Sequence, residues 1–264
     1  MNWTRYFTAS NEPGAPPPPV WVRILNFALV LLLVSVVFVF SFQHLAYKPR
    51  WNSVYAYRTM FVQGWLTTLW ISLVSLALSA LIGLFFALAQ RSHFLPLRYF
   101  SKIYIELVRG TPLLVQIYFF FYVVAVLVHL SDRYVAGILT LSFFSGAYIS
   151  EIIRAGIESV GKSQIESARA IGLTRAQTYR YVIFPQALRQ TLPSLTGQFV
   201  SLIKDSSLLS VISISELTYN ARSVNAITYS TLESYLPLAF GYLILTLPIS
   251  LWTRRLERRH KYET

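Results

Sequence analysis

Six stretches of the chain are apolar over about 18 residues or more, and polar residues fall mainly between them. They cover about residues 22–43, 65–90, 111–130, 134–155, 192–214 and 235–253. A helix needs about 20 predominantly apolar residues to cross the hydrocarbon core of a bilayer. The pattern therefore predicts an all-α integral membrane protein with six transmembrane helices.

Composition and charge support a membrane protein and limit its partners. Of the 264 residues, 55% are hydrophobic and only 13% are charged, fewer than in a typical soluble domain. The net charge of +12 would suggest a nucleic-acid partner in a soluble protein, but here its distribution matters more. If the N-terminus is cytoplasmic, fifteen of the 23 Lys and Arg residues lie on that side and five on the other. The positive-inside rule then predicts a multi-pass membrane protein, N-in and C-in, that binds no nucleic acid.

The two ends of the chain are predicted to lie outside the main transmembrane region. Residues 1–21 contain a short proline run and are expected to form a mobile cytoplasmic tail, and residues 256–264 a basic one. The first apolar stretch is too long for a signal-peptide core, so residues 22–64 are predicted to hold a retained span and an outer interfacial segment. The chain has no cysteine, which excludes disulfides and thiolate chemistry.

The longest polar segment between spans, about residues 158–190, has an ordered spacing. It reads Glu166-Ser-Ala-Arg-Ala-Ile-Gly172, then nine residues, then Val182-Ile-Phe-Pro185. Gly172 permits a turn, and Pro185 lacks an amide hydrogen and so favours a helix boundary. We expect a helix–turn–helix that docks a soluble partner, with the small residues on one helix face where another backbone packs closely. The predicted docking residues are Glu166, Ala168, Ala170, Gly172 and Pro185.

A phosphate-binding motif occurs just before this segment. Gly156-Ile-Glu-Ser-Val-Gly-Lys-Ser163 fits G-x4-G-K-[ST]. The P-loop mechanism needs a buried strand before the loop, so that backbone amides converge on the phosphate. An apolar span precedes Gly156 instead, and no acidic residue ends a strand where it could hold magnesium. We therefore predict that this chain does not bind ATP there.

Several charged and small residues predict local contacts. Glu106 and Arg109 are three residues apart and can pair on one helical face, before Gly110 and Pro112 break or kink the helix. Glu151 and Arg154, also three apart, are expected to pair and to brace their span. In the second stretch the small residues Ser72, Ser75, Ser79 and Gly83 favour close helix contact.

Lys204 and Asp205 are adjacent charges inside a predicted span, where charges normally pair or face a polar cavity. On a helix they point about 100° apart and cannot form one salt bridge. If the helix unwinds there, they could offer a cation and an anion to a zwitterion. Alternatively, each pairs with another helix or with a partner subunit, and the sequence leaves both readings open.

Further stretches are similar to the permease subunits of polar amino acid ABC importers of the histidine/arginine/glutamine type. The docking segment resembles their E-A-A-x3-G-x9-I-x-L-P loop. The other stretches are Val108–Gln116, Gly146–Gly156, Phe184–Leu188, Leu202–Leu208 and Ser210–Thr218. The resemblance covers about residues 60–255. The chain departs from it in its extra first span, since many members have five, and in Gly161, where the family usually has proline.

The resemblance implies a type I importer whose permease domain covers residues 65–255. Two permease chains, either identical or paralogous, would form the pathway, and a periplasmic or surface solute-binding protein would deliver the amino acid. ATP and Mg would bind only to partner ATPase subunits docked on the Glu166 loop, leaving this chain without a catalytic residue or a cofactor. The substrate cavity is expected near Gln116, Gln198, Lys204, Asp205 and Ser206.

Two other functional classes fit the sequence less well. A stand-alone channel or ion-coupled carrier would need no docking element and often contains inverted repeats, which are not apparent here. A membrane enzyme should show converging His, Asp or metal-ligand clusters. The four histidines, His44, His93, His129 and His260, are scattered, so no metal site is predicted. The sequence leaves open which amino acid is carried.

Overall fold

The computed structural model describes residue 7, residues 18–44 and residues 47–260. The chain divides into two units, residues 1–49 and residues 50–264, which are described separately. In the first unit, α2 (Val20–His44) is a single helix whose segment Val20–Ser41 is long and apolar enough to cross a membrane. The proline run and the two tails lie largely outside the described residues.

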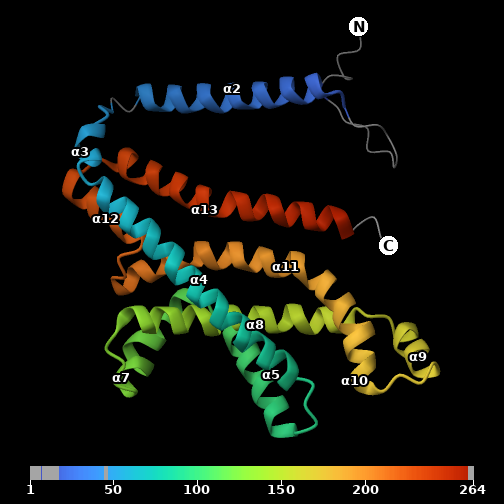
Figure 1. Ribbon diagram of the computed structural model, residues 1–264. Helices are drawn as coiled ribbons and strands as arrows, with labels where there is room; N and C mark the ends of the chain where they lie inside the picture. The colour runs from blue at the N-terminus through green and yellow to red at the C-terminus, as the bar shows by residue number, and fades with distance from the viewer. Residues whose placement is uncertain (1–6, 8–17, 45–46, 261–264) are drawn as a thin grey trace. The chain divides into compact units, whose positions relative to one another are not determined.

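The second unit is helical throughout its regular elements. Its α-helices are α3 (Trp51–Tyr55), α4 (Arg58–Ala89), α5 (Leu95–Gly110), α6 (Leu113–Phe119), α7 (Ala125–Leu127), α8 (Arg133–Glu158), α9 (Lys162–Ala170), α10 (Arg175–Thr178), α11 (Phe184–Asp205), α12 (Leu217–Thr228) and α13 (Thr231–His260). Two π-helical turns, η1 (Phe120–Val124) and η2 (Tyr179–Ile183), and a 3₁₀ helix, η3 (Ser206–Ile212), connect some of them. In Figure 1, α8 runs beside α11, α11 beside α13, and α4 crosses α8.

Among the described residues, four helices are long and apolar enough to span a membrane, namely α2, α4, α8 and α13. A fifth span is possible if α5 and the segment Leu113–Leu127 count as one, although they are bent by 111°. The predicted break after Gly110 is thereby confirmed. The predicted span at 192–214 falls on α11 and η3, which do not meet the same criterion because polar residues such as Gln198 and Lys204 lower their hydropathy. The count of six spans therefore stays a prediction.

The contact between α4 and α8 is built from small residues, as predicted. Ser75 and Ser79 are fully buried. A Cβ atom on Gly83 would lie 2.5 Å from Cγ2 of Ile149, and one on Gly146 would lie 2.7 Å from Cγ2 of Ile82. The two backbones can approach this closely only because both positions are glycine.

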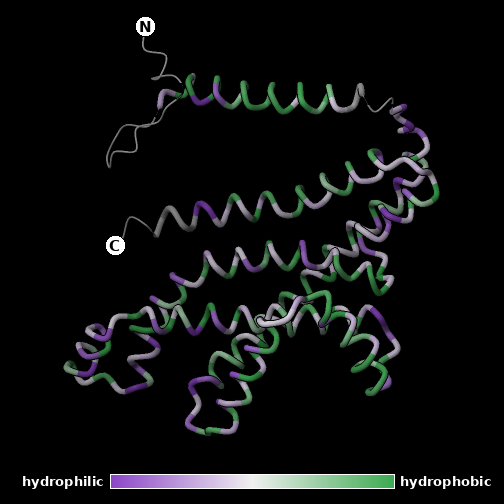
Figure 2. Tube along the Cα trace, turned by 180° about the vertical axis from the view of Figure 1, so that it is seen from behind, coloured by the Kyte–Doolittle hydropathy of each residue, from purple (hydrophilic) through white to green (hydrophobic). Residues whose placement is uncertain are grey.

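A hydrophobic cluster joins α4, α6, α8 and η3. Fully buried Ile71 of α4, Ile117 of α6 and Leu209 of η3 pack in it with Leu141 of α8 and Ile214. Figure 2 shows the contrasting distribution: α2 is apolar over most of its length, whereas polar residues concentrate in the α9–α10 hairpin and the α4–α5 turn. The fold therefore presents polar, non-spanning structure at the end of the unit that carries the predicted docking segment.

Candidate functional site

The turn of the α9–α10 hairpin depends on Gly172. Its φ is +83°, in the left-handed region that favours glycine. Its N–H donates to the carbonyl of Arg169 at 3.0 Å, and the N–H of Leu173 donates to the carbonyl of Ala168 at 3.0 Å. These two bonds form a Schellman motif, which satisfies the last carbonyls of α9 and ends the helix. The prediction of a turn at Gly172 is confirmed.

A capping box begins the second arm of the hairpin. The Thr174 hydroxyl accepts from the N–H of Gln177 at 3.3 Å, and the Gln177 side chain accepts from the N–H of Thr174 at 2.9 Å. From there α10, η2 and α11 follow one another without an intervening loop. Pro185 stands in the first turn of α11, so the predicted boundary is a change from π-helical to α-helical turns and not an end of the helix.

The predicted small-residue face is wrong. Ala168 is only 4% exposed and Ala170 is exposed, because residues two apart on a helix point to different sides. Gly172 lies beyond the end of α9. The residues that the hairpin actually presents include Glu166, Ala170 and Ile171, and Ile171 is 78% exposed. Ile171 directly precedes the glycine that ends the helix, and this position in the sequence could have indicated an exposed apolar side chain.

The base of the hairpin is fixed by packing. Val160, Ile183 and Ala187 form a small buried cluster, with Ile157 and Ile165 packed against it. Gly156 is a helical residue of α8, and a Cβ atom there would lie 2.1 Å from Cγ2 of Thr191 on α11. The first glycine of the P-loop-like motif thus permits a close helix contact, and a helix stands where the mechanism would need a strand.

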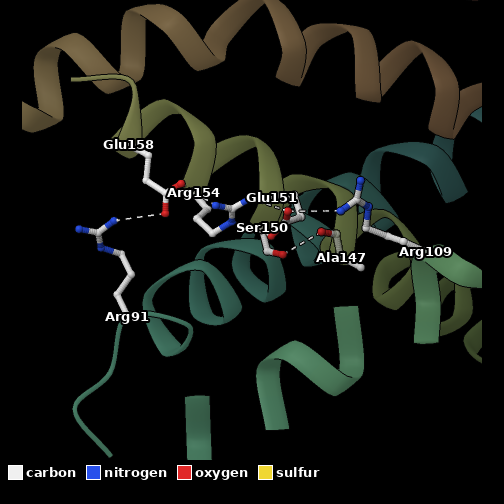
Figure 3. Close-up of polar contacts among 7 residues, drawn as sticks. All are labelled: Arg91, Arg109, Ala147, Ser150, Glu151, Arg154 and Glu158. Atoms are coloured by element: carbon white, nitrogen blue, oxygen red, sulfur yellow. Dashed lines mark hydrogen bonds and ion pairs between the residues drawn. The ribbon is translucent and has the colours of Figure 1, made fainter. Parts of the chain in front are cut away.

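A row of ion pairs connects the base of the hairpin with α5 (Figure 3). Arg91 lies 4.0 Å from Glu158, and Arg154 pairs with Glu158 at 2.5 Å and with Glu151 at 2.9 Å. Glu151 also pairs with Arg109 at 3.3 Å. We call these five residues the charge ladder. At one end the Arg91 guanidinium donates to the hydroxyl of Tyr179 in η2 at 3.3 Å.

The charge ladder confirms one predicted pair and corrects another. Glu151 and Arg154 pair as expected, with Nε and Nη2 of Arg154 each donating at 2.9 Å. Arg109, however, reaches Glu151 on α8 and does not pair with Glu106 on its own helix. The contact crosses 42 positions of sequence, so spacing within α5 could not show it.

The corner between α5 and α6 uses Gln116 as a brace. Its Nε2 donates to the carbonyl of Val108 at 2.7 Å and to Oγ1 of Thr111 at 2.9 Å. These bonds satisfy groups left free where α5 ends. A predominantly apolar cavity of about 510 Å³ lies beside this corner, lined by residues that include Gln116, Phe119 and Phe143. The amide nitrogen of Gln116 is therefore engaged with the protein backbone at the corner.

A polar stripe runs along α11. Ser194, Gln198, Ser201 and Asp205 are spaced i, i+4, i+7 and i+11, which places them on one side of the helix. Nε2 of Gln198 donates to the hydroxyl of Ser145 on α8 at 3.3 Å. Beside the start of the stripe, a cavity of about 490 Å³ between α8 and α11 is lined by Ser194 and by Arg109, Tyr148, Glu151 and Gln190, among others.

The structure separates the remaining predicted substrate residues. α11 continues through Lys204 and Asp205 and then tightens into η3, so the helix does not unwind there. Lys204 is exposed and points away from the stripe, whereas Ser206 is fully buried and donates to the carbonyl of Ile203 at 2.7 Å. Only Gln198 and Asp205 share a face. In the described part of the chain, no three His, Asp or Glu side chains gather as metal ligands would.

Known proteins share both the sequence and this fold. Residues 79–262 match the family described as "Binding-protein-dependent transport system inner membrane component". The glutamine transport system permease protein GlnP of Escherichia coli (strain K12) is 38% identical over 213 residues, which cover 80% of this chain and 97% of GlnP. The L-cystine transport system permease protein TcyB of Bacillus subtilis (strain 168) is 39% identical over 193 residues, 73% of this chain and 82% of TcyB.

Solved structures agree. A chain from the crystal structure of an amino acid ABC transporter with histidines has a TM-score of 0.75 and 36% identity, covering 81% of this chain and all of that one. A chain of the inward-facing MetNI methionine ABC transporter shares the fold, with a TM-score of 0.63 at 20% identity over 76% of this chain and 96% of that one. The chain belongs to the binding-protein-dependent inner membrane components, the permease subunits of ABC importers. It is a transport component, and the ATPase of such a system is a separate subunit.

Proposed function

We propose that this chain forms the translocation pathway for a polar amino acid across the bacterial inner membrane, N-in and C-in. A separate ATPase that carries ATP and Mg drives transport, a solute-binding protein supplies the amino acid, and a second permease chain completes the pathway. The relatives support the substrate class, because their names specify glutamine and L-cystine transport. The observation that carries the proposal is the charge ladder, which joins the hairpin to the α5–α6 corner and lines the cavity between α8 and α11.

The hairpin is the proposed docking site of the ATPase. Glu166, Ala170 and Ile171 supply an exposed surface of one charge, one small residue and one protruding apolar side chain. Gly172 and Pro185 serve by shaping the two arms, and Ala168 by packing inside the hairpin. Residues 158–190 thus act as the coupling loop of a permease domain at 65–255, with residues 1–64 and 256–264 as additions to it.

Movement of the hairpin would reach the pathway through α8. Tyr179 of η2 contacts Arg91, Arg91 faces Glu158, and the ladder ends at Arg109, one residue before α5 ends. The Arg109–Glu151 pair joins α5 to α8, and separating it would leave the partly buried Glu151 carboxylate without that partner. We propose that the ladder transmits closure of the ATPases to the α5–α6 corner and to the α8–α11 cavity.

The amino acid is proposed to pass along the polar stripe of α11. Gln198 and Asp205 face one side, and the stripe meets the α8–α11 cavity at Ser194. Asp205 could hold an amine and Gln198 a carboxylate or side-chain amide. Lys204 projects from the same turn and could attract the carboxylate as substrate enters, while Gln116 and Ser206 hold the shape of the neighbouring corner and of η3.

The test is substrate-stimulated ATP hydrolysis in proteoliposomes with the binding protein present. Asp205→Asn should weaken substrate dependence by about 2–5 kcal/mol of binding, the usual cost of truncating one partner of a desolvated charge pair. Lys204→Ala removes an exposed charge and should cost no more than about 1 kcal/mol. Arg222→Gln, an exposed charge on α12, is the control and should leave the dependence unchanged. If both variants respond to substrate like the unaltered chain, with folding verified, the stripe does not hold the amino acid.

A further inference from the structure

A second polar cleft lies at the turn between α4 and α5 and shares Glu151 and Arg154 with the α8–α11 cavity. It measures about 750 Å³, and its basic lining residues are Arg91, His93, Arg98, Lys102 and Arg154. Glu151 and Glu158 also line it, but both are already engaged with the arginines of the charge ladder. A smaller cavity of about 390 Å³ shares Arg91 and His93 and adds Arg169 and Arg175.

Arg98 and Lys102 are the distinctive residues of this cleft. They stand four positions apart on α5, so both project from one side of the helix. Both are exposed, and neither takes part in the four ion pairs formed within the described ranges. The nearest acidic lining residue on their own helix is Glu106, which leaves an excess of positive charge.

The adjacent side of the same helix is apolar and uncovered. Tyr99, Phe100 and Ile103 are each 59% exposed, and Phe94, just before α5, is 65% exposed. The helix thus carries basic side chains beside large apolar ones, the combination found in helices that lie at a membrane surface. A soluble acidic partner would neutralise the basic side but would leave the apolar side facing water.

We propose that this cleft binds the phosphate of an anionic phospholipid, with Arg98 and Lys102 as its principal ligands. The acyl chains then cover Tyr99, Phe100 and Ile103. One lipid molecule would thus neutralise the basic side of α5 and cover its apolar side. The proposal rests on the proposed function only for which leaflet supplies the lipid. It also places a lipid headgroup beside Arg91, the residue at which the charge ladder meets η2.

The experiment measures lipid retention and needs no transport. The chain is purified with its partners from membranes containing equal phosphatidylglycerol and phosphatidylcholine, and the bound lipids are counted by native mass spectrometry. The matched variants each remove two exposed positive charges: Arg98→Gln with Lys102→Gln in the cleft, and Arg254→Gln with Arg255→Gln near the end of α13. We expect phosphatidylglycerol enrichment in the unaltered chain and in the α13 variant, and a loss of about tenfold or more in the cleft variant, since each basic residue contributes about 1 kcal/mol near an anionic surface.

Three outcomes would overturn the proposal. Equal enrichment in both variants would mean that overall surface charge, and not the cleft, selects the lipid. Displacement of the bound lipid by millimolar glycerol phosphate would identify a free phosphate as the ligand. Loss of the ATPase from the cleft variant with unchanged lipid enrichment would assign the cleft to that partner. Arg98→Lys keeps the charge and should retain the enrichment, which separates lost binding from a folding defect.

Discussion

Glycine has different structural roles in two regions of the molecule, the contact between α4 and α8 and the α9–α10 hairpin. In the first, Gly83 and Gly146 let two long helices meet where any side chain would collide with an isoleucine of the other helix. In the second, Gly172 has no neighbouring atom within 4 Å of a would-be Cβ and is needed only for its backbone conformation. The α4–α8 contact is specified by complementary shape between segments far apart in the sequence. The hairpin is specified by hydrogen bonds between residues close in the sequence.

This difference fits the proposed functions of the two regions, the helices as the translocation pathway and the hairpin as the docking site of the ATPase. A pathway that rocks between two states needs helices that keep their mutual contacts, whereas a docking element must be exposed and still keep one conformation. The Schellman motif and the capping box of Thr174 provide that conformation with little buried surface. Substitutions should therefore have opposite signatures: lost folding in α4 and α8, and lost partner binding with intact folding in the hairpin.

The largest effect is expected from Gly83→Leu. Its Cβ would lie 2.5 Å from Cγ2 of Ile149 and 3.1 Å from the carbonyl oxygen of Gly146, and backbone cannot move aside as a side-chain end can. Overpacking of this kind costs about 1–3 kcal/mol or more, so the thermal midpoint in detergent should fall sharply. Gly110→Ala is the control, because no atom lies within 4 Å of its new Cβ. Equal midpoints in the two variants would contradict the close contact of α4 and α8.

The charge ladder connects the helix bundle with the hairpin. Glu151→Gln tests whether the ladder contributes to folding, to coupling, or to both. Glu151 faces both Arg109 and Arg154 and has a side chain only 20% exposed, whereas the side chain of Glu158 is 51% exposed. Losing hydrogen bonds to charged groups costs about 1.5–3 kcal/mol, and a surface pair about 0–1 kcal/mol. Glu151→Gln should therefore lower stability more than Glu158→Gln, whereas both should lower coupled uptake, because Glu158 is the ladder's partner of Arg91. Uptake and thermal midpoint are the measurements, and normal uptake in both variants would remove the ladder from the coupling route.

Gly172→Asp should act on partner binding more than on folding. A side chain in the left-handed region costs about 1–2 kcal/mol, and the new carboxylate stands on the proposed docking surface. We expect normal insertion, a thermal midpoint lowered by only a few degrees, and loss of ATPase co-purification and of uptake. Gly172→Asn has nearly the same size, tolerates this conformation and is uncharged. If asparagine keeps the ATPase bound and aspartate does not, the added charge on the docking surface is what prevents binding; normal co-purification and uptake with aspartate would refute the docking assignment.

The same contrast explains which features the sequence could predict. The turn at Gly172, the break after Gly110 and the Glu151–Arg154 pair depend on neighbours along the chain, and the structure confirms all three. The Arg109–Glu151 pair depends on which faces α5 and α8 turn toward each other, which no local spacing records.

The sequence also did not show which residues of a motif are buried. Ala168 and Ser206 were expected at working surfaces because of their place in recognisable motifs, yet one is 4% exposed and the other fully buried. For Lys204 and Asp205 the sequence left open whether the helix unwinds, and in the structure α11 passes through both and only then tightens into η3. A motif marks where a segment matters, and the fold decides which of its side chains face a partner.

The smallest effect is expected from Lys162→Ala, within the P-loop-like motif. Lys162 is exposed and begins α9, where a positive charge opposes the helix dipole, so its removal should change stability by no more than about 0.3–1 kcal/mol and in the favourable direction. Nucleotide binding by the whole complex should stay unchanged, because the proposed phosphate sites lie on the ATPase. The measurement is the affinity of the complex for an ATP analogue, together with labelling of the permease purified alone. Saturable labelling at Lys162 would assign nucleotide binding to this chain, whereas an unchanged affinity of the complex together with no labelling would support nucleotide sites on the ATPase alone.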